Sequence, residues 1–282
     1  MTYKSLLTIA TSPGGLLAPV SAAAQIATRM DAHLDALALG VDRTQVGYSY
    51  VGSGAVLVAA AMERAEEEAR ESEAALNAAL GTQLPALRSG VETVVTQLGA
   101  LTDVVAARAR YSDLVVLPLP YGKTRSVADE AVTEAALFEG MAPVLIVPET
   151  GMPNSDPKRI VVAWNQSREA LVATRRSMPF LRRADNVQIV VIDPPAHGPE
   201  RSDPGGLLCQ LLVRHGIHAE VTVLAKSMPR VSDVLARHLR DVDADLKPIV
   251  RQRLARLLID AGKAKEAVPL LELNRLTADL ER

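Results

Sequence analysis

Residues 4–15 read KSLLTIATSPGG, and residues 158–170 read KRIVVAWNQSREA. Each stretch is a short apolar run that ends in small polar residues and leads into a helical pattern. A repeat at this wide spacing indicates two tandem domains of one fold, because the repeats of solenoid proteins recur every 20 to 50 residues or so. Domain architecture, rather than a catalytic motif, is therefore the first guide to function.

The composition bounds the class of protein. The chain of 282 residues has room for about two domains. Hydrophobic residues make up 48% of it but aromatic residues only 3%, so the cores must be built from aliphatic side chains. The formal net charge of −2 argues against a general nucleic-acid binder, which needs a basic face to displace counterions from phosphates.

The sequence also suggests the compartment. The single cysteine, Cys209, excludes an intramolecular disulfide and fits a reducing environment. Pro13 and Gly14 interrupt the N-terminal apolar run too early for a secretory signal. No apolar stretch approaches the roughly 20 residues that span a bilayer. We therefore expect a cytoplasmic protein that binds neither membranes nor nucleic acid.

The first half alternates apolar runs with helical patterns. The predicted strands are 6–10, 34–41, 91–98, 113–119 and 143–148, and the predicted helices are 16–30, 55–80, 100–110 and 127–138. Strands without polar alternation suit a parallel sheet that is covered on both faces. Right-handed crossovers then give a doubly wound α/β sheet.

The second half repeats this order after a linker, GMPNSDPK at 151–158, whose turn-forming residues mark a boundary. Its predicted strands are 159–164, 187–193 and 219–225, with helices at 168–181, 205–216 and 231–239. A fourth strand is missing where it should begin near 243–246. We therefore predict an α/β domain at 1–150, a truncated second α/β domain at 151–246 and a helical tail at 247–282.

The missing strands have a structural consequence. In a sheet of order 3-2-1-4-5, the loss of strands 4 and 5 leaves the strand at 160–164 on an edge with unpaired backbone groups. The helical tail, the sheet of the first domain or a second copy of the chain could cover that edge. We predict a homodimer on this ground.

These two blocks resemble tandem universal stress proteins. The likeness covers 4–148, through ARARYSDLVVL at 107–117 and APVLIVPE at 142–149, and then 158–246, through VVAWNQSREA and LLVRHGIHAEV. In that family the nucleotide-binding members carry an acidic residue after strand one and a G-x2-G-x9-G-[S/T] pattern after strand four. The glycines of such a pattern let backbone N–H groups approach phosphates.

The nucleotide pattern of the family is degraded in this chain. The acidic position is Thr11 in the first block and Asn165 in the second, so both lack the charge. The place of the last glycine and hydroxyl falls on Glu130 and Ala131, where a carboxylate would repel phosphate. The earlier glycines fall near 117–120, where prolines supply no N–H donor. The second block lacks the segment. The resemblance thus implies the fold and argues against ordinary ATP binding.

One remnant of a phosphate loop follows strand four. Gly122, Lys123 and Thr124 imitate the end of a G-x4-G-K-[S/T] loop, whose first glycine is replaced by Leu117. This segment is either an anion site or an ordinary surface turn. With Thr11 and Ser12, which follow strand one, these three residues form the candidate nucleotide site, and ATP is the only cofactor we consider.

The tail resembles a single tetratricopeptide-type helical hairpin. RLARLLIDAGKAKEAVPLLE at 253–272 places Gly262 at the turn between two apolar helix faces. Such units normally need neighbours to bury those faces. The hairpin either packs on its own domain or docks another helical protein.

Other chemistry finds little support in the sequence. The five histidines have no ligand spacing with cysteine or carboxylates, so we expect no metal site. No G-x-S-x-G nucleophile elbow occurs. The leading hypothesis is a non-enzymatic stress-response protein with a degenerate nucleotide site that acts through association. The alternatives are an adenine-nucleotide sensor with a rearranged loop and an adaptor that binds a protein partner through its tail.

Overall fold

The computed structural model describes residues 2–43, 54–82, 87–122, 125–194, 197 and 202–240. It contains two sheets, as the sequence predicted, and both belong to a doubly wound α/β fold. Its contacts group the chain into two compact units, Met1–Ile160 with Leu171–Asn186 and Val161–Ala170 with Val187–Arg282. The predicted tail at 247–282 lies outside the described residues, and the domain boundaries near 150 and 246 stay predictions.

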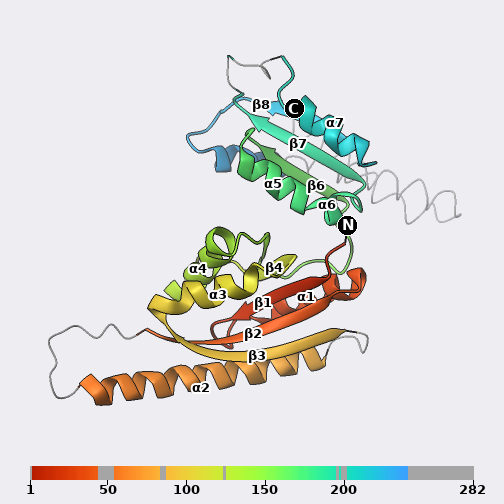
Figure 1. Ribbon diagram of the computed structural model, residues 1–282. Helices are drawn as coiled ribbons and strands as arrows, with labels where there is room; N and C mark the ends of the chain where they lie inside the picture. The colour runs from red at the N-terminus through yellow and green to blue at the C-terminus, as the bar shows by residue number, and fades with distance from the viewer. Residues whose placement is uncertain are drawn as a thin grey trace, which may run out of the picture. The chain divides into compact units, whose positions relative to one another are not determined.

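The first sheet has five parallel strands in the order β3-β2-β1-β4-β5 (Figure 1). The strands are β1 (Ser5–Ala10), β2 (His33–Asp42), β3 (Arg88–Gln97), β4 (Leu114–Pro118) and β5 (Val144–Val147). All five predicted strands of this block are therefore confirmed, with small shifts at their ends. β1 is buried over its whole length after Ser5, because helices cover both of its faces.

Helices cover the two faces of this sheet. One face carries α1 (Leu17–Met30) and α2 (Gly54–Gly81), and the other carries η1 (Leu98–Ala100), α3 (Leu101–Ala109), α4 (Val127–Glu134) and η2 (Ala135–Glu139). The alternation of side chains along a strand divides the core accordingly. Leu7, Ile9 and Leu37 pack with α3 and α4, whereas Leu6 and Leu34 pack with α1.

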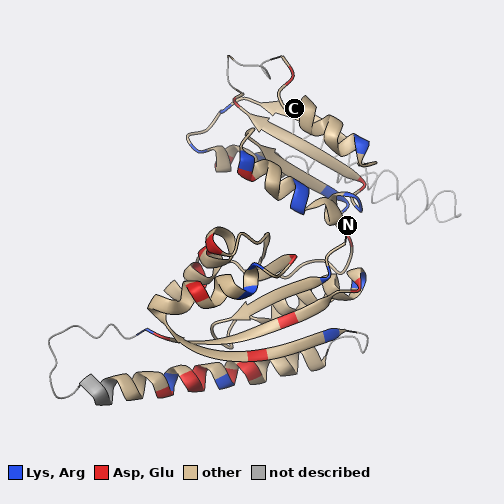
Figure 2. Cartoon of the chain, viewed as in Figure 1, with Lys and Arg blue, Asp and Glu red and all other residues tan. Residues whose placement is uncertain are grey.

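The long helix α2 packs unusually close to β2. Ala65 and Ala69 are buried there, and Gly40 lies opposite them on β2. A Cβ added at Gly40 would stand only 2.2 Å from the carbonyl oxygen of Ala65, so this strand position must be glycine. Lys or Arg and Asp or Glu residues both occur along α2 (Figure 2). Glu66 and Glu67 are exposed, so these charged residues of α2 lie on a solvated face of the helix.

The predicted helix at 127–138 is confirmed, but its geometry changes in its second half. The chain leaves α-helical geometry after Glu134 and continues as η2, a π-helical turn. Gly140 N–H then donates to the Ala135 carbonyl at 2.8 Å. A Cβ at Gly140 would lie 2.7 Å from the Ala109 methyl group, so close packing against α3 determines where this element ends.

The second sheet contains three described strands in the order β6-β7-β8. The strands are β6 (Arg159–Trp164), β7 (Asn186–Ile192) and β8 (Ala219–Leu224). The helices are α5 (Arg168–Arg176), α6 (Met178–Leu181), α7 (Gly206–Arg214) and a helix at 231–240. The sequence predicted one helix at 168–181; it is broken before Met178, because Pro179 has no N–H to continue the α-helical hydrogen bonds.

β6 lies at an edge of the described second sheet, as the sequence predicted. Ile160, Val161 and Val162 are only partly buried, and Ala163 is exposed. β1, the equivalent strand of the first sheet, has β4 and β2 as neighbours and is buried. Among the described helices none combines the length and the apolar character needed to cross a membrane.

Candidate functional site

The order of the first sheet creates a crevice at the ends of two strands. β1 and β4 are neighbours, and the chain leaves their carboxyl ends toward opposite faces of the sheet. We call this crevice the switch point, because the connections from the two strands go to opposite faces of the sheet there. In open α/β sheets, ligands bind at such a point. The residues that surround it here are Thr8–Ser12 from β1 and its turn, Gly14, Gly15, Leu16, Pro19, Val20, Pro118, Arg125 and Asp129.

The first feature of the switch point is a hydrogen-bonded carboxylate. Thr11 is buried, and its Oγ1 donates to Asp129 Oδ1 at 2.6 Å. The other oxygen, Oδ2, accepts from the backbone N–H of Ser126 at 2.7 Å and from Ser126 Oγ at 3.0 Å. Ser126 and Asp129 thus form a capping box at the start of α4. Thr11 ties the turn after β1 to this cap.

The second feature is a buried guanidinium group. The side chain of Arg125 is only 8% exposed, and its Nη1 and Nη2 atoms stand 3.0 Å from the place where a Cβ of Gly15 would be. Gly15 has a φ of +73°, so glycine is required here both for the conformation and for the space. Arg125 Nη2 lies 3.9 Å from Glu149 Oε1, and the buried Nε has no hydrogen-bond partner.

Together these side chains fill the switch point. The remaining cavity has a volume of about 10 Å³, which holds one water molecule at most. A guanidinium and a carboxylate of the chain itself occupy the region between the turn after β1 and the start of α4. A nucleotide could enter only if Arg125 moved.

The structure places the predicted site residues differently. Thr11 and Ser12 line the switch point. Gly122 lies in the turn after β4, where its carbonyl accepts from the Arg125 N–H at 3.3 Å, and it is not among the lining residues. Lys123 and Thr124 lie outside the described residues. That these five residues bind a nucleotide stays a prediction.

Sequence reasoning missed Gly15, Arg125 and Asp129. It placed the repelling carboxylate at Glu130, but Glu130 is exposed and the preceding residue, Asp129, faces the site. The S-x-x-D spacing of Ser126 and Asp129 was the available signal, because it is the signature of a capped helix start. No local pattern identifies Arg125, since its partner surface at Gly15 is distant in the sequence.

The Cys209 thiol and the possible metal-binding side chains offer little further chemistry. Burial and then the neighbouring Asp203 carboxylate raise the pKa of the Cys209 thiol, whose Sγ lies 3.4 Å from the Ala219 carbonyl oxygen. A raised thiol pKa opposes nucleophilic reactivity. Within the described residues, no three His, Cys, Asp or Glu side chains are arranged to hold a metal ion.

The fold and the switch point define a Rossmann-like α/β protein. Comparison with solved structures identifies the type of Rossmann-like fold more closely. The structure is similar to a universal stress protein from Archaeoglobus fulgidus, with a TM-score of 0.56 and 14% identity over 84% of this chain and 82% of that chain. At this identity the likeness shows the fold alone: the chain has the fold of the universal stress proteins.

Two other solved structures cover about half of this chain. UspA from Lactobacillus plantarum has 20% identity and a TM-score of 0.36 over 52% of this chain and 98% of its own. A universal stress protein in complex with cAMP has 19% identity and a TM-score of 0.29 over 53% of this chain and 99% of its own. No family model and no curated protein matches the sequence.

Proposed function

We propose that this chain is a universal stress protein-like, non-catalytic stress-response protein whose nucleotide site is closed by its own side chains and which acts through association. The observation that carries the proposal is the filled switch point. Arg125 and Asp129 occupy the region where a ligand would bind, and the cavity left is about 10 Å³. A single cysteine fits a cytoplasmic location.

The electrostatics support the closed site. A triphosphate would bring several negative charges next to Asp129, whose oxygens already accept three hydrogen bonds from Thr11 and Ser126. Displacing Arg125 would also take its guanidinium away from the Glu149 carboxylate, which lies 3.9 Å from Nη2. Both effects oppose phosphate binding, because charges in a poorly hydrated site interact more strongly than in water.

Thermal-shift and calorimetric titration of the full chain with ATP, ADP and AMP tests the closed site. A ligand that binds only the native state at 100 times its Kd stabilises it by about 2.7 kcal/mol, so binding would be visible as a raised Tm. We expect no saturable shift. Saturable binding, or ATP hydrolysis that is abolished by changes at Gly122 or Lys123, would refute the closed, non-catalytic site.

One observation favours the nucleotide sensor as a second candidate. The Arg125 Nε is buried without a hydrogen-bond partner, so the closed state does not satisfy this group. In a sensor, Arg125 would swing out and pair with phosphate. The variant Arg125→Ala separates the two functions. It weakens nucleotide binding if Arg125 is a ligand, and it leaves binding absent or creates it if Arg125 is a plug.

The exposed edge of β6 supports the association part of the proposal. Within the part of the chain that the structure describes, β7 is the one strand next to β6, and a half-buried apolar edge strand favours pairing with another strand. We expect the full chain to sediment as a dimer and Val162→Lys to shift it toward the monomer. Val231→Lys, at an exposed position of the helix at 231–240, is the matched control. A monomeric mass at high concentration would contradict dimerisation.

A further inference from the structure

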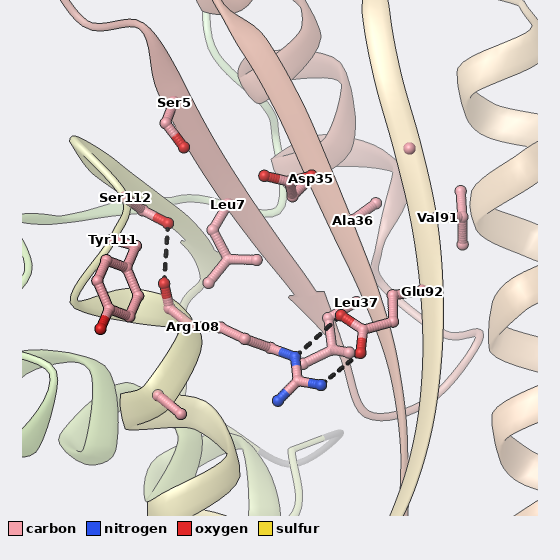
Figure 3. A pocket seen from close by; sticks show the side chains of 12 residues that line it. Ser5, Leu7, Asp35, Ala36, Leu37, Val91, Glu92, Arg108, Tyr111 and Ser112 are labelled. Atoms are coloured by element: carbon pink, nitrogen blue, oxygen red, sulfur yellow. Dashed lines mark hydrogen bonds and ion pairs between the residues drawn. The ribbon is translucent and has the colours of Figure 1, made fainter.

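A second concave region lies on the other end of the first sheet, on the face that carries α3. We call it the sheet-face groove (Figure 3). Its volume is about 400 Å³, within the 300–1,000 Å³ range of small-molecule sites. It is lined by Ser5 and Leu7 of β1, Asp35–Leu37 of β2, Gly90–Glu92 of β3, and Ala107, Arg108, Tyr111 and Ser112 at the end of α3.

The groove exists because α3 is short and because glycine lies at its base. α3 has nine residues, whereas β2 and β3 have ten residues each and extend further. Gly90 leaves its side of the groove open, since a Cβ there would meet only His33 Nε2, at 3.9 Å. Among the described helices, none covers this part of the sheet.

One charged pair on the rim is already satisfied. Arg108 Nε donates to Glu92 Oε2 at 3.0 Å, and its Nη2 donates to Oε1 of the same carboxylate. Its Nη1 donates to the Val104 carbonyl at 3.1 Å. All three guanidinium nitrogens thus have partners, and the hydrogen bond from Arg108 lowers the pKa of Glu92. An anionic ligand would have to compete with Glu92 for this cation.

A second carboxylate on the rim has no permanently charged partner among the groove's lining residues. Asp35 is exposed on β2, and its contact is with His33 Nε2 at 3.2 Å, which is an ion pair only when the imidazole is protonated. In Figure 3 the Asp35 carboxylate stands on the strand side of the groove, apart from the Arg108–Glu92 pair. It is the charge that a ligand can approach.

An exposed aromatic ring completes the groove. The Tyr111 side chain follows α3 and is 81% exposed, although tyrosine carries a large apolar ring. Aromatic faces attract ammonium and guanidinium groups, which also form ion pairs with carboxylates. Tyr111 and Asp35 come from different elements and border one cavity.

We propose that the sheet-face groove binds an organic cation, an ammonium or guanidinium group on an aliphatic stem, with its charge against Asp35 and its stem beside Tyr111. The same chemistry is found in free polyamines and in the Lys or Arg side chains of a protein. The site is separate from the switch point, so it does not depend on whether a nucleotide binds there.

Isothermal titration calorimetry of the full chain tests this with three probes: spermidine, an end-blocked lysine peptide and inorganic phosphate. We expect saturable binding of at least one cationic probe, weakened by added salt, and none of phosphate. Binding of spermidine alone identifies a small-molecule site, whereas binding of the peptide alone identifies a protein-docking site. The absence of saturable binding of both cations at millimolar concentration overturns the proposal.

Matched variants identify the groove as the location. Asp35→Asn should weaken binding about tenfold, and Asp35→Glu should restore most of it. Tyr111→Ala should weaken binding about two- to fivefold, because the stem loses an apolar contact comparable to roughly one buried methylene group. The controls are Glu134→Gln and Tyr121→Ala, exposed residues outside the groove. If the controls weaken binding as much as the groove variants do, the interaction is non-specific and the proposal fails.

Discussion

Replacing Gly40 by alanine should destabilise the protein far more than a single methyl group ordinarily does. The new Cβ would stand 2.2 Å from the Ala65 carbonyl oxygen and 2.9 Å from the Ala69 methyl group, whereas ordinary van der Waals contact begins at 3.4 Å. The nearest atom belongs to the backbone of α2, so no side-chain rotation can relieve the overlap. The helix must move away from β2.

The size of the effect follows from this geometry. Overpacking a core by a methyl group costs about 1–3 kcal/mol, and a backbone neighbour places Gly40→Ala at the upper end, about 3 kcal/mol. For a domain of 150–250 residues, each kcal/mol lowers Tm by about 2–4 °C. We therefore expect a drop of about 6–12 °C in thermal unfolding followed by far-ultraviolet circular dichroism.

Gly90 on the adjacent strand is the matched control. Its added Cβ would have no neighbour closer than 3.9 Å. Gly90→Ala should leave Tm unchanged or raise it slightly, because alanine restricts the unfolded chain by about 0.4–1 kcal/mol. If Gly40→Ala and Gly90→Ala melted at the same temperature, the close approach of α2 to β2 would be refuted, and with it the packing of this face of the sheet.

Three further outcomes can be checked. Thr11→Val should lower the free energy of unfolding in urea by about 1–3 kcal/mol, because it leaves Oδ1 of the partly buried Asp129 carboxylate without the hydrogen bond from Thr11; equal stability of Thr11→Val and the wild type would contradict this. The pKa of Glu92 is lowered by Arg108, and a carboxylate with a lowered folded-state pKa contributes stability that is lost as the pH falls from the unfolded value of 4.5 through the folded one. Tm should therefore fall less between pH 7 and pH 3 in Glu92→Gln than in the wild type, and parallel curves would exclude a role for this pair. Cys209 should react with a thiol reagent at neutral pH more slowly in the folded than in the urea-unfolded chain, since burial raises the pKa of its thiol; equal rates would show that the folded thiol is not protected.

Much of the architecture could be predicted from local patterns. The apolar runs at 6–10 and 160–164 became β1 and β6, because a short continuous apolar run next to turn-forming residues favours a strand of a parallel sheet. The helical periodicity at 55–80 became α2, whose Ala65 and Ala69 are buried and whose Glu66 and Glu67 are exposed. Local patterns did not predict the change to π-helical geometry at η2, where Gly140 packs closely against Ala109 of α3.

Only some features of the candidate site could be predicted from the sequence. The absence of the acidic residue and of the glycine pattern could be read directly, and so could the position of Thr11 after the first strand. The closure by Arg125 could not, because it depends on the Arg125 side chain packing against Gly15, which is distant in the sequence. The sheet-face groove was equally hidden, since its residues come from three strands and one helix.

The sequence by itself thus determined the order of strands and helices, the repeat of that order and the absence of the glycine pattern that nucleotide-binding universal stress proteins carry. These properties can be read from the spacing of residues along the chain, because hydrophobic periodicity and turn-forming residues are local patterns. Only the tertiary structure decided that the switch point is filled, that β6 is half exposed where β1 is buried, and that Asp35 and Tyr111 border one groove. Each of these three features results from packing between segments that are distant in the sequence, and no local sequence pattern encodes that packing.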